Sequence, residues 1–265
     1  MKQPSSILVS TVVILTFLVR YFLGDILGLF GASIPEFPYW PYTAISSYNL
    51  FWFAILGTVI YLMLRGNVLE HLGLFKGLGK GFLWAFIFTL PMAIGYALLG
   101  TFNTEYTLES FCQRALRAGI EEEIFYRGFL FGLLFRYGRW GFFPAAMVNA
   151  VVFSIGHLYQ AHDPLSAAGV LGVTSLGACW FAWLYIEWDN NLWVPIFVHL
   201  LMNFFWAIFT IDNTAIGSTM GNVFRVATIA LSIILTIRMA KKRGGLTITG
   251  RRWLKGPKEE LVSAT

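Results

Sequence analysis

The sequence predicts an all-α fold, a polytopic membrane bundle of about eight transmembrane helices. Hydrophobic residues make up 57% of the 265 residues and charged residues only 12%, whereas an average soluble domain has about 45–50% apolar and about 25% charged residues. The mean hydropathy is +0.66. The apolar residues also fall into runs of about 20, the length that a helix needs to cross a bilayer. These observations argue against a soluble globular domain, a disordered chain and a nucleic-acid-binding module.

Small residues lie inside many of the apolar runs, which suits close helix packing in lipid. Strands of about ten alternating residues, typical of a membrane β-barrel, are not seen. No signal-peptide cleavage site stands out after the first run, so we expect this run to be retained as a helix. The expected spans are residues 7–22 with a continuation toward 30, 49–64, 82–99, 108–135, 140–157, 165–186, 192–209 and 223–237.

The distribution of lysine and arginine predicts the orientation, because cytoplasmic loops collect these residues. The loops at 31–47, 100–107, 158–164 and 210–221 contain neither residue. With a cytoplasmic N-terminus these loops face outward, although Arg20, Arg114, Arg117 and Arg225 near the outer helix ends are exceptions. The residues then expected on the inner face are Lys2, Arg65, Lys76, Lys80, Arg136, Arg139 and the basic residues from Arg238 onward.

We therefore expect a multi-pass protein of the cell membrane with both termini in the cytoplasm. The chain divides into one integral membrane domain, residues 1–240, and a basic cytoplasmic tail, residues 241–265. The simplest role of this tail is to anchor the topology, and contact with anionic lipid is a second possibility.

Ionisable side chains inside a membrane are costly and mark candidate functional sites. Three apolar spans carry such residues. The span 108–135 holds Glu121, Glu122, Glu123 and Arg127, the next ends at His157, and the span 192–209 holds His199 and Asn203. Arg20 and Asp25 in the first run are interpreted as a separate interfacial pair without a functional role.

Helical spacing brings these residues into register. Glu123 and Arg127 are four apart and can pair on one face, whereas Glu122 points about 100° away in a helix of 3.6 residues per turn. We expect Arg127 to hold one carboxylate while the other faces a cavity. In the predicted topology, Glu122, His157, His199 and Asn203 meet at one depth in the outer half of the bilayer.

Such a cluster has the components for amide hydrolysis without a covalent intermediate. A glutamate beside a histidine can take a proton from water as a general base, and a histidine with an asparagine can stabilise an oxyanion. A zinc site formed by the two histidines and a glutamate is a chemical alternative, although the sequence lacks HExxH. We interpret Phe153, Asn149, Glu187 and His162 as packing, structural or loop residues.

Three motifs resemble those of the CPBP family, which includes the type II CAAX prenyl endopeptidases and Abi-type intramembrane glutamic proteases. EEIFYRG, from Glu122 to Gly128, resembles its EExxxR motif, FSIGH resembles FxxxH, and HLLMN resembles HxxxN. The motifs occur in the family's order within about residues 108–206. The resemblance implies an eight-helix CAAX protease-like enzyme with a glutamic-type, metal-free site.

Carried over by motif position, the resemblance implies that Glu122 activates water with the help of His157, and that His199 and Asn203 form the oxyanion hole. Glu123 and Arg127 would be supporting residues. Glu121 has no counterpart in the motif, and only the register starting at Glu122 places an arginine four residues after the second glutamate. The resemblance implies no cofactor, with zinc as the alternative.

The expected partners are a membrane-anchored peptide or protein substrate and the lipid bilayer, with no nucleic acid. The predicted outer position of the cluster does not imply a prenylated cytosolic substrate. Two other classes of function stay open at this stage: a non-catalytic bacteriocin-immunity or binding membrane protein, and a small proton-coupled transporter. A purely structural role of the polar residues, as an ion pair and hydrogen bonds between helices, is the remaining alternative.

Overall fold

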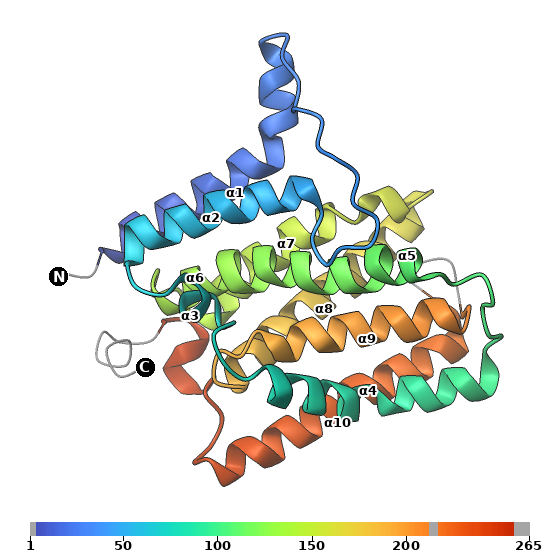
Figure 1. The fold of residues 1–265 in the computed structure, drawn as a ribbon. Coiled ribbons are helices and arrows are strands. Elements are labelled where there is room, and N and C mark those ends of the chain that lie inside the picture. The colour runs from blue at the N-terminus through green and yellow to red at the C-terminus, as the bar shows by residue number, and fades with distance from the viewer. Residues whose placement is uncertain (1–3, 212–216, 257–265) are drawn as a thin grey trace.

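A computed structural model describes residues 4–211 and 217–256, and within these ranges it contains helices and no β-strand (Figure 1). Lys2, Lys258 and the end of the predicted tail lie outside the described residues, as does part of the predicted outer loop 210–221. In chain order the elements are α1 (Ser6–Leu29), α2 (Ser47–Leu64), α3 (Val68–Leu72), α4 (Leu78–Leu99), α5 (Leu108–Ser110), η1 (Phe111–Leu116), η2 (Ala118–Phe131), α6 (Gly132–Arg136), α7 (Phe142–Ile155), η3 (Leu158–Gln160), α8 (Pro164–Glu187), α9 (Trp193–Ile208), α10 (Thr219–Lys242) and η4 (Gly250–Trp253).

The all-α membrane architecture is confirmed. Six helical segments of the described chain are long and apolar enough to cross a membrane: α1, α2, α4, α7 together with η3, α8 and α10. The two other expected spans take different forms. α9 is apolar but has only 16 residues, and the span predicted at 108–135 is divided among α5, η1, η2 and α6.

These last four elements form one continuous helix, called the central helix below (residues 108–136), since the αR backbone at Arg117 joins η1 to η2. The central helix contacts α1, α7, α8 and α9. Figure 1 shows α1 and α2 along one side of it and α9, α4 and α10 on the other. Residues on different faces of the central helix therefore reach different neighbouring helices.

The central helix has π-type turns, with hydrogen bonds from residue i to i+5, over Phe111–Leu116 and Ala118–Phe131. Such turns are rare and are found most often at functional sites. The angle of about 100° between successive side chains, which we expected for Glu122 and Glu123, holds for 3.6 residues per turn and does not apply here. The glutamates nevertheless point to different partners, as described below.

Glycines allow the neighbouring helices to approach the central helix closely. A Cβ on Gly119 would lie 3.0 Å from the carbonyl oxygen of Ile196 in α9, and one on Gly132 would lie 3.1 Å from the ring of Tyr185 in α8. Small residues serve this purpose in membrane bundles, where packing rather than water exclusion drives association.

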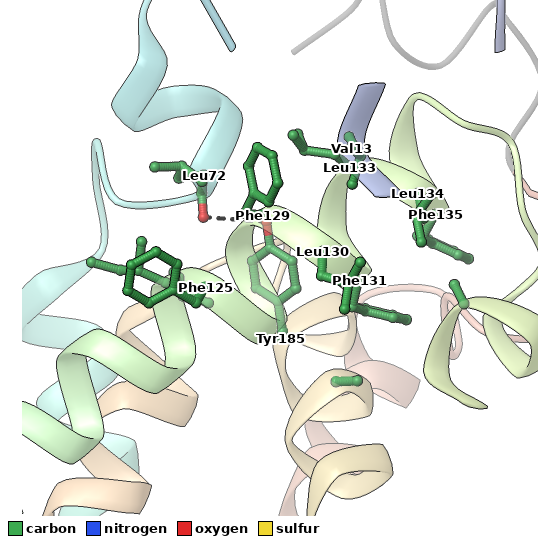
Figure 2. Close-up of a cluster of buried hydrophobic side chains, with 14 of the residues drawn as sticks. Val13, Leu72, Phe125, Phe129, Leu130, Phe131, Leu133, Leu134, Phe135 and Tyr185 are labelled. Atoms are coloured by element: carbon green, nitrogen blue, oxygen red, sulfur yellow. Dashed lines mark hydrogen bonds between the residues drawn. The ribbon is translucent and has the colours of Figure 1, made fainter. Parts of the chain in front are cut away.

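Apolar side chains fill the second half of the central helix and its surroundings. Figure 2 shows Phe125, Phe129 and Phe131 in this cluster together with Tyr185, whose hydroxyl donates a hydrogen bond to the carbonyl oxygen of Leu72 (3.3 Å). These three phenylalanines are at most 1% exposed. The polar site therefore lies on a helix that dense packing holds in place.

The chain after α10 folds back onto the bundle. The carboxylate of Glu187, which is 1% exposed, accepts hydrogen bonds from the main-chain N–H groups of Thr247 and Ile248, both at 2.8 Å. Trp253 packs edge-on against Phe142. Residues 243–256 are thus fixed against the ends of α7 and α8 (Figure 1).

Candidate active site

Three helices deliver polar side chains to one place in the bundle. The central helix carries Glu122, Glu123 and Arg127 in its π-type segment. His157 lies two residues after the end of α7, and His199 lies near the middle of α9. The contact of η2 with both α7 and α9 brings the three motifs together.

The innermost part of the site is an ion pair between Glu123 and Arg127. Nη1 of Arg127 donates to Oε1 of Glu123 at 3.0 Å, and both side chains have 0% exposure. The guanidinium carbon of Arg127 lies 4.4 Å from the ring centroid of Phe153 in α7 and 5.1 Å from that of Phe181 in α8. Cation–π contacts stabilise a desolvated cation, so Phe153 has a defined packing role under the arginine.

His199 is bound to the same buried carboxylate. Its Nδ1 lies 2.8 Å from Oε1 of Glu123, and its ring stacks on Phe181 with centroids 5.3 Å apart. The oxygen paired with Arg127 therefore also fixes the orientation of the histidine. The polar chain runs from Arg127 through Glu123 to His199.

Glu122 is partly exposed, unlike Glu123. Its side chain is 30% exposed, and its Oε2 lies 4.0 Å from Nε2 of both His157 and His199. These separations exceed the length of a direct hydrogen bond. This oxygen is shielded from solvent and has no hydrogen-bond partner among the described residues.

The hydrogen bonds of the two histidines determine which ring nitrogens face Glu122. Nδ1 of His157 lies 2.7 Å from the carbonyl oxygen of Phe153. A carbonyl oxygen accepts and cannot donate, so Nδ1 of His157 carries the proton. Nδ1 of His199 likewise donates to the carboxylate of Glu123. Both rings therefore turn Nε2 toward Glu122, where it is free to exchange protons or to hydrogen-bond to a ligand.

Asn203 is not brought into contact with the other three predicted site residues. One turn beyond His199, its amide donates to the main-chain oxygen of Arg114 at 3.3 Å. Arg114 lies in η1, earlier on the central helix than Glu122. The described contact of Asn203 therefore ties α9 to the central helix beside the site.

Glu121 belongs to a separate polar network. It accepts hydrogen bonds from the main-chain N–H of Ser46 (2.5 Å) and from Nδ2 of Asn49 (2.7 Å). Oδ1 of Asn49 in turn accepts from Nη2 of Arg20 (3.0 Å), and the Arg20 guanidinium carbon lies 3.7 Å from the ring centroid of Phe125. The three consecutive glutamates therefore face three different sets of partners.

Arg20 was missed as a residue of this network. The proposed interfacial pair with Asp25 does not occur among the ion pairs of the described residues, because Arg20 reaches α2 and the central helix instead. The sequence did indicate that Arg20 has a polar partner, since an arginine in an apolar span needs one. Its partners, however, are 29 or more residues away in sequence.

Asn149 and Glu187 contact main-chain atoms of other segments, as expected for residues with a structural role. Asn149 is fully buried, and its amide lies 3.5 Å from the main-chain oxygen of Ala178 in α8. Glu187 binds the returning chain at the other end of α8. His162, in the loop before α8, donates its main-chain N–H to Oγ of Ser166 in the first turn of α8.

Several shielded polar atoms around the ion pair have no hydrogen-bond partner among the described residues. They are Oε2 of Glu122, Oε2 of Glu123, and Nε and Nη2 of Arg127. Buried polar atoms usually have a partner from the protein, from water or from a ligand. These atoms lie close together where the three motifs meet, so this region is a polar part of the bundle interior.

The zinc alternative requires a set of ligands that converge on one point. No group of three or more His, Cys, Asp or Glu side chains in the described part of the chain is placed to hold a metal ion. A zinc site normally has three or four protein ligands. In the present arrangement the Nε2 atoms of His157 and His199 each lie 4.0 Å from Oε2 of Glu122.

The arrangement is suited to acid–base chemistry on a neutral substrate. A partly exposed carboxylate with two imidazoles near one of its oxygens can accept a proton from water. A histidine whose Nδ1–H is held by a buried carboxylate can also donate from Nε2 to a developing oxyanion when both ring nitrogens carry protons. The Nε2 atoms of both histidines lie 4.0 Å from the same oxygen of Glu122.

Part of the chain is similar to known membrane peptidases. Residues 104–205 match the family model described as "Type II CAAX prenyl endopeptidase Rce1-like". The chain is also 39% identical over 93 residues to the Bacillus subtilis (strain 168) protein named "Putative membrane peptidase YdiL", a match that covers 35% of this chain and 34% of that protein. The chain thus spans about a third of the length of this curated relative. No match to a solved structure was found.

Proposed function

We propose that this protein is an intramembrane endopeptidase that hydrolyses a peptide bond with a glutamate-activated water. The proposal is supported by the match of residues 104–205 to the Rce1-like family model and by the similarity to the protein named "Putative membrane peptidase YdiL". The observation that carries this proposal is the position of Glu122, with one oxygen 4.0 Å from the Nε2 atoms of both His157 and His199. A carboxylate with two imidazoles around one oxygen suits general-base chemistry on a small nucleophile.

Glu122 is proposed as the general base. It takes a proton from water while the hydroxide attacks the carbonyl carbon of the substrate, and the proton then passes to the departing amine as the C–N bond breaks. His157 assists because its Nδ1 is engaged with Phe153, which directs Nε2 toward Glu122. This mechanism needs no covalent intermediate.

His199 is proposed to stabilise the oxyanion. Its Nδ1 donates to Glu123, which leaves Nε2 as the ring nitrogen that faces the substrate, and Nε2 can donate to the oxyanion when it carries a proton. Arg127 keeps Glu123 in place and balances its charge.

Asn203 is proposed as a second donor to the oxyanion. Its amide is bound to the oxygen of Arg114 in the unliganded site, so this role requires the side chain to turn toward the substrate. The separation of Asn203 from His199 by one helical turn makes such a movement short.

The proposed substrate is a membrane-anchored peptide or protein segment. A site that lies between apolar helices receives its substrate from the lipid phase or from the membrane surface. The absence of lysine and arginine from the loops at 100–107 and 158–164, near this end of the bundle, supports an extracytoplasmic site with both termini in the cytoplasm.

Cleavage in proteoliposomes tests the proposed function. The purified protein is reconstituted with a pool of membrane-anchored peptides that have randomised sequences next to the anchor, and the products are identified by mass spectrometry. New peptide termini support the protease. Retention of peptides without cleavage would indicate the binding or immunity class, and proton flux without cleavage would indicate a transporter.

A chelator in the same assay tests the role of metal. The proposed mechanism predicts that cleavage is unchanged after treatment with 1,10-phenanthroline and after dialysis into metal-free buffer. Loss of cleavage that added zinc restores would show that a metal is required and would contradict the proposed role of Glu122.

A further inference from the structure

A cavity with several charged residues in its wall lies away from Glu122, where α6 and α8 end. It has a volume of about 630 Å³ and is surrounded by the end of α6, the end of α8 and the segments that lead into α4 and α9. The candidate active site lies instead midway along the central helix and just beyond the end of α7, and none of its residues lines the cavity. The two sites are therefore separate.

The wall of this cavity is rich in cations. Lys76, Lys80, Arg136 and Arg252 line it, against the two acids Glu70 and Asp189. The four cations and two anions give the lining a net formal charge of +2. A concave, cationic wall of this kind attracts anions.

The acid Asp189 is already neutralised by the protein. It forms an ion pair with Nη1 of Arg243 at 2.7 Å and lies 4.0 Å from Nζ of Lys80. Both cations also lie within 6 Å of the buried ring of Trp188, at 5.5 Å for Lys80 and 5.6 Å for Arg243. Lys80 and Arg243 are therefore already held close together beside the ring of Trp188.

Lys76 differs from these neighbours because it forms no ion pair or hydrogen bond with any described residue. Its side chain is exposed at the cavity edge, in the segment between α3 and α4. A lysine in this position is available to a bound anion without breaking an existing contact.

The mouth of the cavity adjoins apolar surface of the kind that faces lipid. Phe75 is 60% exposed, and Leu78 and Phe82 in the first turns of α4 are 53% and 49% exposed. α4 is one of the helices that can span the membrane. A ligand with a charged head and an apolar chain would place the head among the lysines and the chain along α4.

We propose that this cavity binds the phosphate headgroup of an anionic glycerophospholipid. The phosphate would contact Lys76, Lys80 and Arg252, and the acyl chains would lie on Phe75 and Leu78. Basic pockets between transmembrane helices at the cytoplasmic surface bind anionic lipid heads in this way. Since Arg252 comes from the returning C-terminal segment, bound lipid would also hold this segment against the bundle.

Short-chain lipids in detergent test the proposal on the full-length protein. Binding of dioctanoyl phosphatidylglycerol, dioctanoyl phosphatidylcholine and inorganic phosphate is measured by isothermal titration calorimetry. We expect phosphatidylglycerol to bind at least tenfold more tightly than either other ligand. Equal affinity for phosphatidylcholine would overturn the requirement for an anionic head, and equal affinity for inorganic phosphate would overturn the assignment to lipid.

Matched charge variants distinguish the cavity from the general basic surface. Each lysine next to an anionic lipid contributes about a fivefold change in affinity. Lys76→Gln should therefore weaken binding about fivefold, and Lys76→Gln/Lys80→Gln about 25-fold. The control, Lys241→Gln/Lys242→Gln, removes the same charge from exposed positions at the end of α10 and should change the affinity less than twofold.

The single variant keeps the test valid if the double variant folds poorly, because Lys76 has no described partner to lose. Far-ultraviolet circular dichroism verifies the fold of each variant. Equal weakening by the cavity and control variants would refute a specific site in the cavity.

Discussion

His199 places its Nδ1 2.8 Å from Oε1 of Glu123, the fully buried glutamate of the motif, whereas the partly exposed Glu122 lies 4.0 Å from the other nitrogen of the same ring. One histidine thus connects the two glutamates. Glu123 has a positioning role in this arrangement, and Glu122 keeps an oxygen available for chemistry. The consecutive glutamates are consequently expected to respond differently to mutation.

Variants of the buried Glu123–Arg127 ion pair are expected to affect stability and activity differently. Glu123→Leu leaves Arg127 as an unpaired buried charge, which costs about 3–5 kcal/mol in the free energy of unfolding. Glu123→Leu/Arg127→Met removes both charges and should recover most of this loss. Thermal unfolding in detergent measures the stability.

Both variants should nevertheless be inactive, because His199 loses the carboxylate that orients its ring. A double variant as unstable as the single one would contradict the account of the ion pair. A double variant that retains cleavage would contradict the positioning role of Glu123.

Asn203 gives a test of the proposed oxyanion hole. Loss of one oxyanion donor lowers kcat by about 10²–10³-fold, so Asn203→Ala should lower kcat to this extent with little change in KM. If the asparagine only ties α9 to the oxygen of Arg114, the variant will show a lower Tm and a nearly unchanged kcat. Steady-state kinetics and thermal unfolding on the same preparation distinguish these results.

The start of α8 predicts a dependence of stability on pH. Asp163 caps this helix, and hydrogen bonds from the main chain and the side chain of Ser166 lower the pKa of its carboxyl group. A lowered pKa in the folded state stabilises the protein above the unfolded value of about 3.9, and this stabilisation is lost as the pH falls through the folded pKa.

Asp163→Ala should therefore have a lower Tm than the wild type at pH 7, and the difference should shrink as the pH is lowered below about 4. Thermal unfolding of both proteins across this pH range measures the difference. A Tm difference that is independent of pH would show that the charge of Asp163 does not contribute.

The orientation predicts which residues can be labelled from each side. In a background with Cys112 and Cys179 replaced by alanine, single cysteines are introduced at the exposed positions Thr104 and Lys255. An impermeant maleimide added to intact cells should label position 104, and position 255 should react only after permeabilisation. The reverse pattern would invert the topology and move the site to the cytoplasmic half.

The apolar runs of the sequence were sufficient to locate the helices. Each expected span coincides with a helical segment, because about 20 apolar residues have few alternatives to a helix in lipid. The π-type turns at Phe111–Leu116 and Ala118–Phe131 could not be predicted, since the apolar pattern does not distinguish them from α-helical turns.

Motif spacing anticipated the meeting of Glu122, His157 and His199, because each motif fixes a face of its own helix. It did not anticipate that Asn203 binds the oxygen of Arg114 or that Glu121 binds Asn49. These contacts depend on how the helices rotate and approach one another. That information lies in the packing of the whole bundle and not in any local pattern.

The central claim is that Glu122 alone among the three glutamates acts as the general base, and the chain offers its own control. Glu121→Gln and Glu122→Gln remove the same charge at adjacent positions, but Glu121 contacts Ser46 and Asn49 whereas Glu122 faces the two histidines. The most direct measurement is the initial rate of peptide cleavage in proteoliposomes for both variants. The account predicts that Glu122→Gln lowers kcat at least about 100-fold while Glu121→Gln stays within about threefold of the wild type. Full cleavage by Glu122→Gln would contradict it.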